Sequence, residues 1–245
     1  MKFVSSLAIL LVSASCALSI EITGKVICCY QGWFRTPDDG SGNGWHHYAN
    51  RRTFEPGTAT IDLWPDVSEL PEDARVDTGF KHADGSVAQV FSSSSEAVVK
   101  MHFRWMREYG IDGVFIQRFG VIARNERTRA PMDKVLTHAI AEAATTERAW
   151  GIMYDLSGLR PGNTDVITED WLRLKRDHST GDLEKHPTYL EFDGKPLVAL
   201  WGFGFSDRAP MWEDWRQLVS FFKDEQGCAV MLGIPTYWRE MERDA

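Results

Sequence analysis

Residues that could bind a polar ligand follow the ends of five short apolar runs of the sequence. Carboxylate, amide and guanidinium groups can hydrogen-bond hydroxyls, and flat aromatic rings can stack on C–H faces. The residues in question are Tyr30, Gln31, Trp33, Gln117, Arg118, Asp155, Trp201 and Tyr237, with Asp207 in a nearby loop. Trp45, His46, His47 and Trp64 follow the first run and could fold over the same opening. Aromatic rings of this kind suit stacking on the C–H faces of sugars and also suit ordinary cores.

Each of these residues also has a purely structural interpretation. Asp155 could accept backbone N–H groups from the turn at residues 156 to 158 that follows it. Gln117 and Arg118 could simply hold loops, and Arg118 could form an ion pair with Asp155. Taken singly, the aromatic residues favour core packing, whereas as a set around one opening they favour a ligand platform.

The apolar runs alternate with amphipathic stretches, and this alternation predicts a parallel sheet with crossover helices. The strand-like runs are residues 26 to 30, 111 to 116, 150 to 154, 197 to 201 and 228 to 232. Apolar residues recur at helical spacing within residues 98 to 109, 132 to 143, 171 to 174 and 212 to 222. Ser94 or Ser95 can cap the first helix, and Gly110 can end it.

The residues that follow the strand-like runs distinguish between two fold classes. No G-x-G-x-x-G follows the first run and no P-loop pattern occurs, so a (β/α)8 TIM-type barrel is favoured over a dinucleotide-binding fold. Five units cannot close such a barrel, so we expect one truncated after about five β/α units, forming one domain over residues 20 to 245. Residues 35 to about 92 are dense in Gly, Pro and Asp, and a long irregular segment is expected there.

Composition excludes several classes of partner. The formal net charge is -8 and the pI is about 5.4, so binding to nucleic acid or to an anionic membrane surface is not expected. No Cys/His spacing resembles a zinc site, and the loop at residues 38 to 44 lacks the closing Glu of an EF-hand, so no metal or cofactor is predicted. Cys28, Cys29 and Cys228 fit no disulfide framework, and Cys28 and Cys29 are expected to be small buried hydrophobic residues.

The N-terminus has the layout of a secretory signal peptide. Lys2 precedes an apolar run at residues 3 to 12, and small residues follow up to residue 19. The run is shorter than the roughly 20 apolar residues that span a bilayer. Residues 1 to 19 are therefore predicted to be a signal peptide of a secreted or periplasmic protein. Lipid attachment through Cys16 is the less favoured alternative, because Ser13 stands where an aliphatic residue is expected.

Five segments, in this order along the chain, resemble the glycoside hydrolase family 71/99-like group. They are CYQGWF at residues 29 to 34, DGSG and GW within 39 to 45, DLWPD at 62 to 66, WMREYGIDG at 105 to 113 and MYDLSG at 153 to 158. The resemblance runs from about residue 25 onward. It implies a (β/α)8 fold that acts on α-linked glycans, since members of the group include endo-α-mannosidases and α-1,3-glucanases.

The same resemblance bears on catalysis. Asp155 matches an acid at the same strand end in family 99, which makes it the candidate catalytic or sugar-contacting residue. Glycoside hydrolysis usually needs two carboxyl groups, and family 99 carries them in a late E-x-x-E. The E-x-x-E of this chain, Glu69 to Glu72, precedes the second strand-like run and does not match. This chain alone is therefore expected not to cleave glycans, and a noncatalytic glycan-binding or structural protein is the alternative.

Overall fold

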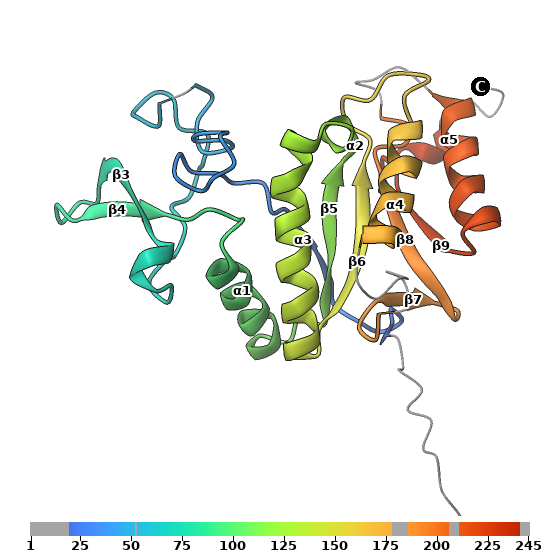
Figure 1. The fold of residues 1–245 in the computed structure, drawn as a ribbon, viewed down its shortest axis with the longest axis horizontal. Helices are drawn as coiled ribbons and strands as arrows, with labels where there is room; N and C mark the ends of the chain where they lie inside the picture. Colours follow the sequence, from blue (N-terminus) through green and yellow to red (C-terminus); the bar gives the residue numbers. More distant parts are fainter. Residues whose placement is uncertain (1–19, 52, 178–185, 206–210, 241–245) are drawn as a thin grey trace, which may run out of the picture.

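Five parallel strands, each hydrogen-bonded to the next one along the chain, form the centre of the protein in the computed structural model (Figure 1). They are β2 (Ile27–Tyr30), β5 (Gly113–Phe119), β6 (Ala149–Asp155), β8 (Lys195–Trp201) and β9 (Ala229–Gly233). The structure describes residues 20–51, 53–177, 186–205 and 211–240; the predicted signal peptide, Cys16 and Asp207 lie outside them. All five strands fall on predicted runs, which confirms the α/β class and the mainly parallel sheet.

The strand order separates this sheet from a doubly wound fold. A doubly wound sheet reverses its order at a switch point, whereas these five strands are neighbours in sequence order. Among the described residues, β2 and β9 do not pair with each other, so these strands form an open sheet. Closure into a barrel therefore stays a prediction.

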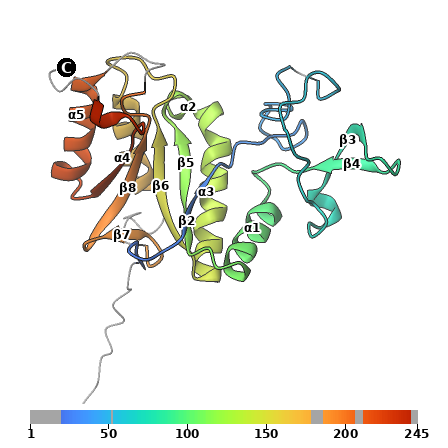
Figure 2. The same ribbon diagram turned by 180° about the vertical axis from the view of Figure 1, so that it is seen from behind.

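Helices cover one face of the sheet (Figures 1 and 2). They are α1 (Glu96–Glu108), α3 (Glu126–Thr146), α4 (Asp165–Asp177) and α5 (Trp212–Ser220), with the short α2 (Gly120–Ala123) directly after β5 and the π-helical turn η3 (Phe221–Glu225) after α5. Alternate strand residues such as Ile116, Ile152 and Val198 are buried beneath them. Since side chains alternate along a strand, the residues between these point to the opposite face, which we call the inner face.

The inner face carries a smaller apolar cluster. Phe115, Met153 and Ala199 are buried there. The N-terminal segment packs against this cluster: β1 (Ile20–Glu21) pairs in parallel with β7 (Leu190–Phe192), and β7 pairs antiparallel with the start of β8. These contacts occupy the amino-end half of the inner face and leave the carboxyl ends of the strands uncovered by β1 and β7.

Residues 35 to 92 contain regular structure that the sequence reading did not predict. The 3-10 turn η1 (Glu72–Ala74) leads into an antiparallel hairpin of β3 (Val76–Lys81) and β4 (Val87–Val90). Figure 1 shows this hairpin on the far side of α1 from the sheet. The hairpin region has a separate core of aromatic rings, in which Phe54 stacks on Trp64 with 5.7 Å between the two ring centroids. The expectation of an irregular segment was therefore wrong for part of it.

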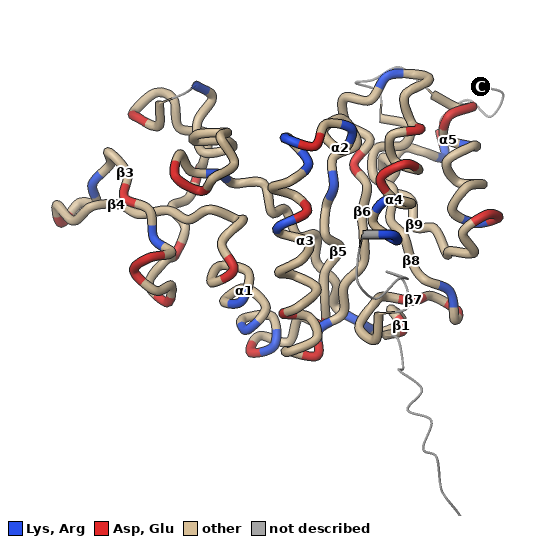
Figure 3. The backbone as a smooth tube through the Cα atoms, in the orientation of Figure 1, with Lys and Arg blue, Asp and Glu red and all other residues tan. Residues whose placement is uncertain are grey.

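Four further features concern the cysteines, the charged residues, the segment after β9 and the apolarity of the helices. Cys28 and Cys29 of the edge strand β2 are exposed, which corrects the expectation that they are buried, whereas Cys228 is buried. The positions of Lys and Arg are interspersed with those of Asp and Glu along the backbone (Figure 3). A short 3-10 turn, η4 (Trp238–Glu240), follows β9. Among the described residues, no helix has the length and apolarity needed to cross a membrane.

A buried ion-pair network joins the sheet to its helices. Arg118 of β5 has no exposed surface, and it donates through Nε to Asp170 of α4 at 2.8 Å and through Nη2 to Asp133 of α3 at 2.8 Å. Tyr154 of β6 donates to the same Asp170 carboxylate at 3.1 Å. Burial disfavours the charge on Asp170, but Arg118 and Arg173 outweigh burial and hold its pKa below the usual value. The network therefore fixes α3 and α4 against β5 and β6.

We predict that Asp170→Ala destabilises the protein strongly. Removing one partner of a buried pair leaves the Arg118 charge without its closest carboxylate, which costs about 3 to 5 kcal/mol. Asp165→Ala is the matched control, because its ion pair with Arg124 is more than half exposed on both sides and should contribute less than about 1 kcal/mol. Urea unfolding of both variants is the measurement, and equal losses of stability would contradict the prediction.

Candidate functional site

The carboxyl ends of the strands bring several predicted residues to one edge of the inner face. Phe119, Asp155, Trp201 and Gly233 form one row of paired positions across β5, β6, β8 and β9. The ring of Trp201 lies over Gly233, where an added Cβ would come within 2.1 Å of it. Only glycine therefore leaves room for the indole in this position. Trp201 itself is 42% exposed and can be reached by a ligand.

Asp155 is fixed in this row by two hydrogen bonds. It is 4% exposed, and its Oδ2 accepts from Nε2 of Gln117 at 2.6 Å. Its Oδ1 accepts from the backbone N–H of Ser157 at 2.7 Å. The turn motif that the sequence allowed for Asp155 is thus present. Its carboxylate and the Gln117 amide form one rigid unit at the ends of β5 and β6.

A cavity of about 220 Å³ adjoins this unit. Its walls come from the segment after β2, the end of β5, α2 and the first half of α3, and include Gln31, Trp33, Gln117, Phe119, Ile122 and Met132. Gly32 makes the close approach of the first wall possible, because a Cβ there would lie 2.5 Å from Val135 of α3. The predicted residues Gln31, Trp33 and Gln117 therefore line one space.

Trp33 stacks on two other rings in this wall. Its centroid lies 4.6 Å from that of His47 and 5.3 Å from that of Phe119, with interplanar angles of 17° and 24°. The expected open platform at Trp33 is therefore already in contact with protein rings. Trp33 fixes the segment of residues 31 to 47 to β5, and a ligand meets mainly its edge and the neighbouring polar groups.

His47 adopts an unusual backbone conformation in this stack. Its φ of 63° lies in the left-handed region, which is uncommon for a residue with a side chain. Partial burial, His46 and Arg35 together lower the pKa of His47 to about 4. The ring is therefore neutral at physiological pH. No sequence pattern predicted this conformation, although His47 was expected in the segment that could cover the opening.

Three predicted residues lie elsewhere. Tyr30 faces the helices, where its hydroxyl lies 2.9 Å from Nδ1 of His102, and burial raises its pKa. Arg118 also faces the helices, and its partners are Asp170 and Asp133, which corrects the suggested pairing with Asp155. Trp64 belongs to the aromatic core of the hairpin and donates to the backbone oxygen of Gln89 at 2.7 Å.

Tyr237 follows β9 and is 39% exposed. In the sequence it lies between the end of β9 and η4, and its role as a ligand contact stays a prediction. Phe119, which the sequence reading passed over, joins the site because it stands two residues after Gln117 on the same face of β5.

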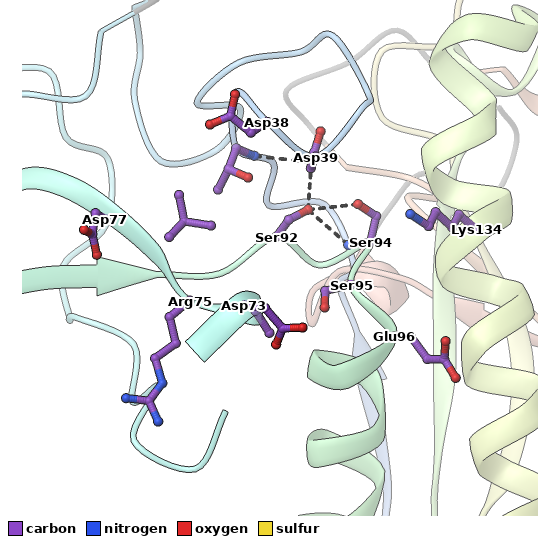
Figure 4. Close-up of a pocket in the computed structure, with 13 residues that line it drawn as sticks. Asp38, Asp39, Asp73, Arg75, Asp77, Ser92, Ser94, Ser95, Glu96 and Lys134 are labelled. Carbon is purple, nitrogen blue, oxygen red and sulfur yellow. Dashed lines mark hydrogen bonds between the residues drawn. The ribbon is translucent and has the colours of Figure 1, made fainter. Parts of the chain in front are cut away.

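A second cavity, of about 700 Å³, lies between the hairpin region and helices α1 and α3 (Figure 4). Asp39 accepts from the hydroxyl of Ser92 at 2.7 Å, and Ser92 in turn lies 2.9 Å from Ser94. Burial disfavours the Asp39 carboxylate, but hydrogen bonds from Ser41, Ser92 and Thr36 lower its pKa overall. Within the part of the chain that the structure describes, no group of three or more His, Cys, Asp or Glu side chains is arranged to hold a metal ion.

Comparison with known proteins gives distant structural neighbours. No family model matches the sequence, and no curated protein matches it. Two solved structures of the GH99 endo-alpha-mannosidase from Bacteroides thetaiotaomicron, one in complex with BIS-TRIS-propane, overlap with 72% of the chain at 17% and 18% identity. Their TM-scores are 0.42 and 0.43, which are too low to establish a common fold or site. The overlap spans 41% and 44% of those chains, so this chain covers less than half of their length.

We predict that lowering the pH reduces the folding stability of the protein through protonation of His47. Its folded pKa of about 4 lies below the ordinary 6.5, so between these values the unfolded chain binds a proton that the folded chain does not. Stability should therefore fall as the pH drops from 6.5 towards 4, and partly buried His102, with a pKa of about 4, adds to the same loss. Urea unfolding at several pH values measures it.

His47→Asn, which tolerates the left-handed backbone, should make this pH dependence shallower than in the unmodified protein. His82→Asn, in the exposed turn between β3 and β4, serves as the control and should leave the slope unchanged. A slope that is the same in His47→Asn would exclude His47 as one of the groups responsible.

Proposed function

We propose that this protein binds an α-linked glycan at the carboxyl edge of its parallel sheet. The observation that carries the proposal is the row of strand-end residues, where the Asp155–Gln117 unit stands between a cavity of about 220 Å³ and the exposed ring of Trp201. Carboxylate and amide groups hydrogen-bond sugar hydroxyls, and an exposed indole stacks on sugar C–H faces. Gln31 and Tyr237 are further polar and aromatic groups at this edge.

The location of the site supports the same proposal. In barrels of parallel strands, ligands bind at the carboxyl ends of the strands, and the sequential strand order is the order such a barrel needs. We therefore propose a (β/α)8-type architecture for the domain from residue 20 onward. The segments that resemble the glycoside hydrolase 71/99-like group support α-linked mannose or glucose polymers as the substrate class.

The site favours binding over hydrolysis in this chain. The inner-face residues at the described strand ends are Gln31, Gln117, Phe119, Asp155, Trp201 and Gly233. They include one carboxyl group, whereas both common hydrolytic mechanisms use two. Glu69, from the E-x-x-E of the sequence, forms an ion pair with Arg104 and accepts from Nε1 of Trp105 at 3.1 Å. It is thus held on α1, near the turn that leads into the amino end of β5.

We predict that Trp201→Ala weakens glycan binding about threefold to tenfold, the usual size of one aromatic contact. The ring is 42% exposed, so its loss should leave the fold intact. Calorimetric titration with α-mannan and α-1,3-glucan oligosaccharides measures the affinity, and a reducing-sugar assay with the same compounds tests for hydrolysis.

The matched control is Tyr109→Ala, an aromatic residue that is 77% exposed at the C-terminal end of α1, at the amino-end side of the sheet. It should bind glycans as the unmodified protein does. Absence of binding to every α-linked oligosaccharide, or an equal loss in both variants, would contradict the proposed site. Release of reducing sugar would show that a second carboxyl group acts in the reaction.

We further propose that the protein is exported after removal of residues 1 to 19. The layout of the N-terminus supports this, and the acidic, non-membrane composition is compatible with it. We predict an intact mass that corresponds to a mature N-terminus between Cys16 and Ile20. An exported protein that retains Met1 would contradict the prediction, and a mass increase at Cys16 would show lipid attachment.

A further inference from the structure

Arg35 is a buried cation that forms no ion pair with any described residue. It is 3% exposed, and its guanidinium makes one hydrogen bond within that part of the chain, from Nη1 to the backbone oxygen of Phe34 at 2.9 Å. Burial lowers the pKa of Arg35, and the charge of Asp39 offsets this only in part. A guanidinium stays charged in proteins, and a buried charge is costly unless it is paired. Arg35 therefore calls for a counter-ion.

Asp39 does not supply that direct partner. Its Oδ2 accepts from the hydroxyl of Ser92 at 2.7 Å and from the backbone N–H of Thr36 at 3.3 Å, and its Oδ1 accepts from the backbone N–H of Ser41 at 2.9 Å. These bonds hold the carboxylate in the wall of the cavity of about 700 Å³. Asp39 thus reduces the positive potential at Arg35 without accepting a hydrogen bond from it.

The remaining donors of Arg35 form a fork. Nε and Nη2 lie on the same edge of the guanidinium plane, and no described residue accepts a hydrogen bond from either. Neither atom is fully sealed from solvent. Arg118 shows what the same edge binds in this protein, since its Nε and Nη2 donate to the two oxygens of Asp170 at 2.8 and 3.0 Å. Such a fork matches the paired oxygens of an oxyanion.

The cavity of about 220 Å³ that Arg35 lines has a positive character. Arg35 shares its wall with His46 and His47, and none of the described residues that line it is Asp or Glu. The cavity of about 700 Å³ has the opposite character (Figure 4): its lining includes Asp38, Asp39, Asp73, Asp77 and Glu96. In a chain with a formal net charge of -8, the smaller cavity is thus the one whose charge favours an anion.

The ring of His47 experiences the same positive charge. Burial, then His46 and Arg35, lower its pKa to about 4, so Arg35 and His47 are close enough to interact electrostatically. The ring stacks on Trp33, and its nitrogens form no hydrogen bond with a described residue. A neutral imidazole carries one N–H donor. His47 therefore has a donor to offer to an anion held by Arg35.

We propose that the cavity of about 220 Å³ binds a small oxyanion, a sulfate, phosphate or carboxylate group, through Nε and Nη2 of Arg35 and the ring of His47. Ligand pockets for larger molecules begin at about 300 Å³, so this cavity suits a free ion or one charged group of a larger ligand. The inference goes beyond the proposed glycan binding, because neutral mannose and glucose polymers carry no such group.

The first experiment compares ions at equal ionic strength. Calorimetric titration with sulfate, inorganic phosphate and acetate should show binding to the unmodified protein, with sodium chloride as the background. Arg35→Gln should lower the affinity at least about tenfold, because it removes the charge and the fork. Arg35→Lys keeps the charge without the fork and should give an intermediate affinity. His47→Asn should lower the affinity about twofold to fivefold.

Arg75→Gln is the matched control. Arg75 also donates to backbone oxygens, those of Leu70 and Ser68, but it lines the acidic cavity of about 700 Å³. This variant should bind the three ions as the unmodified protein does. Thermal unfolding in chloride confirms that each variant is folded. Sulfate also stabilises proteins through exclusion from their surface, so only the additional stabilisation that Arg35→Gln loses and Arg75→Gln keeps is counted as binding.

Two further measurements locate the ion and identify its source. Ring resonances of His47 should move on addition of sulfate, whereas those of His82, in the turn between β3 and β4, should not. Titration with glucuronate and glucose 6-phosphate, against neutral glucose, distinguishes a charged group of a larger ligand from a free ion. Tighter binding of the charged sugars identifies the first source, and binding of the ions alone identifies the second. Either result supports the site if Arg35→Gln removes it.

Absence of binding to every oxyanion, or equal affinity in Arg35→Gln and the unmodified protein, would overturn the proposal. The proposed glycan binding is tested separately with neutral α-linked oligosaccharides. If the unmodified protein binds oxyanions but no neutral oligosaccharide, the proposed function fails and the oxyanion site stands.

Discussion

A fully buried guanidinium, that of Arg118, connects β5 to both α3 and α4. A charge in such a place is tolerated only when carboxylates reach it with good geometry. Asp170 and Asp133 do so from two different helices, and Tyr154 adds a hydroxyl from the neighbouring strand. Sliding either helix by one turn would remove one of the two carboxylates from Arg118. The helix layer is therefore held in one register by an electrostatic requirement in addition to apolar packing.

The candidate site depends on the same pair of strands through their opposite face. Arg118 and Tyr154 point to the helices, so their chain neighbours Gln117 and Asp155 point to the inner face. The Gln117–Asp155 hydrogen bond therefore stands directly behind the buried network. The two sets of side chains share the backbones of β5 and β6 but have no hydrogen bond between them among the described residues.

Sequence reasoning found the strands and part of the site, for reasons that can be stated residue by residue. Asp155 and Gln117 were reached because polar residues after buried apolar runs mark strand ends. Arg118 was misplaced because β5 continues to Phe119, three residues beyond the predicted end, and alternation then turns Arg118 to the helices. Tyr30 is the last residue of both the predicted run and β2, and it was misplaced because its side chain packs on the helix side of the sheet.

The hairpin region shows a second kind of feature that sequence patterns do not predict. Trp64 and Phe80 carry no periodic signal, since their packing joins residues far apart in a segment rich in turns. The stacking of Trp33 on His47 likewise depends on the left-handed backbone conformation of His47. No residue type in that segment predicts this conformation. Such features come from tertiary contacts, and local pattern cannot supply them.

The alternation along β5 also limits how this part of the chain can change over evolution. A single-residue insertion or deletion within residues 113 to 119 would shift every later side chain to the other face. A guanidinium would then enter the ligand edge and an amide would replace it among the helix carboxylates. A substitution changes one of these contacts, whereas a change of length changes all of them. The strand should therefore keep its length even among relatives whose loops differ widely.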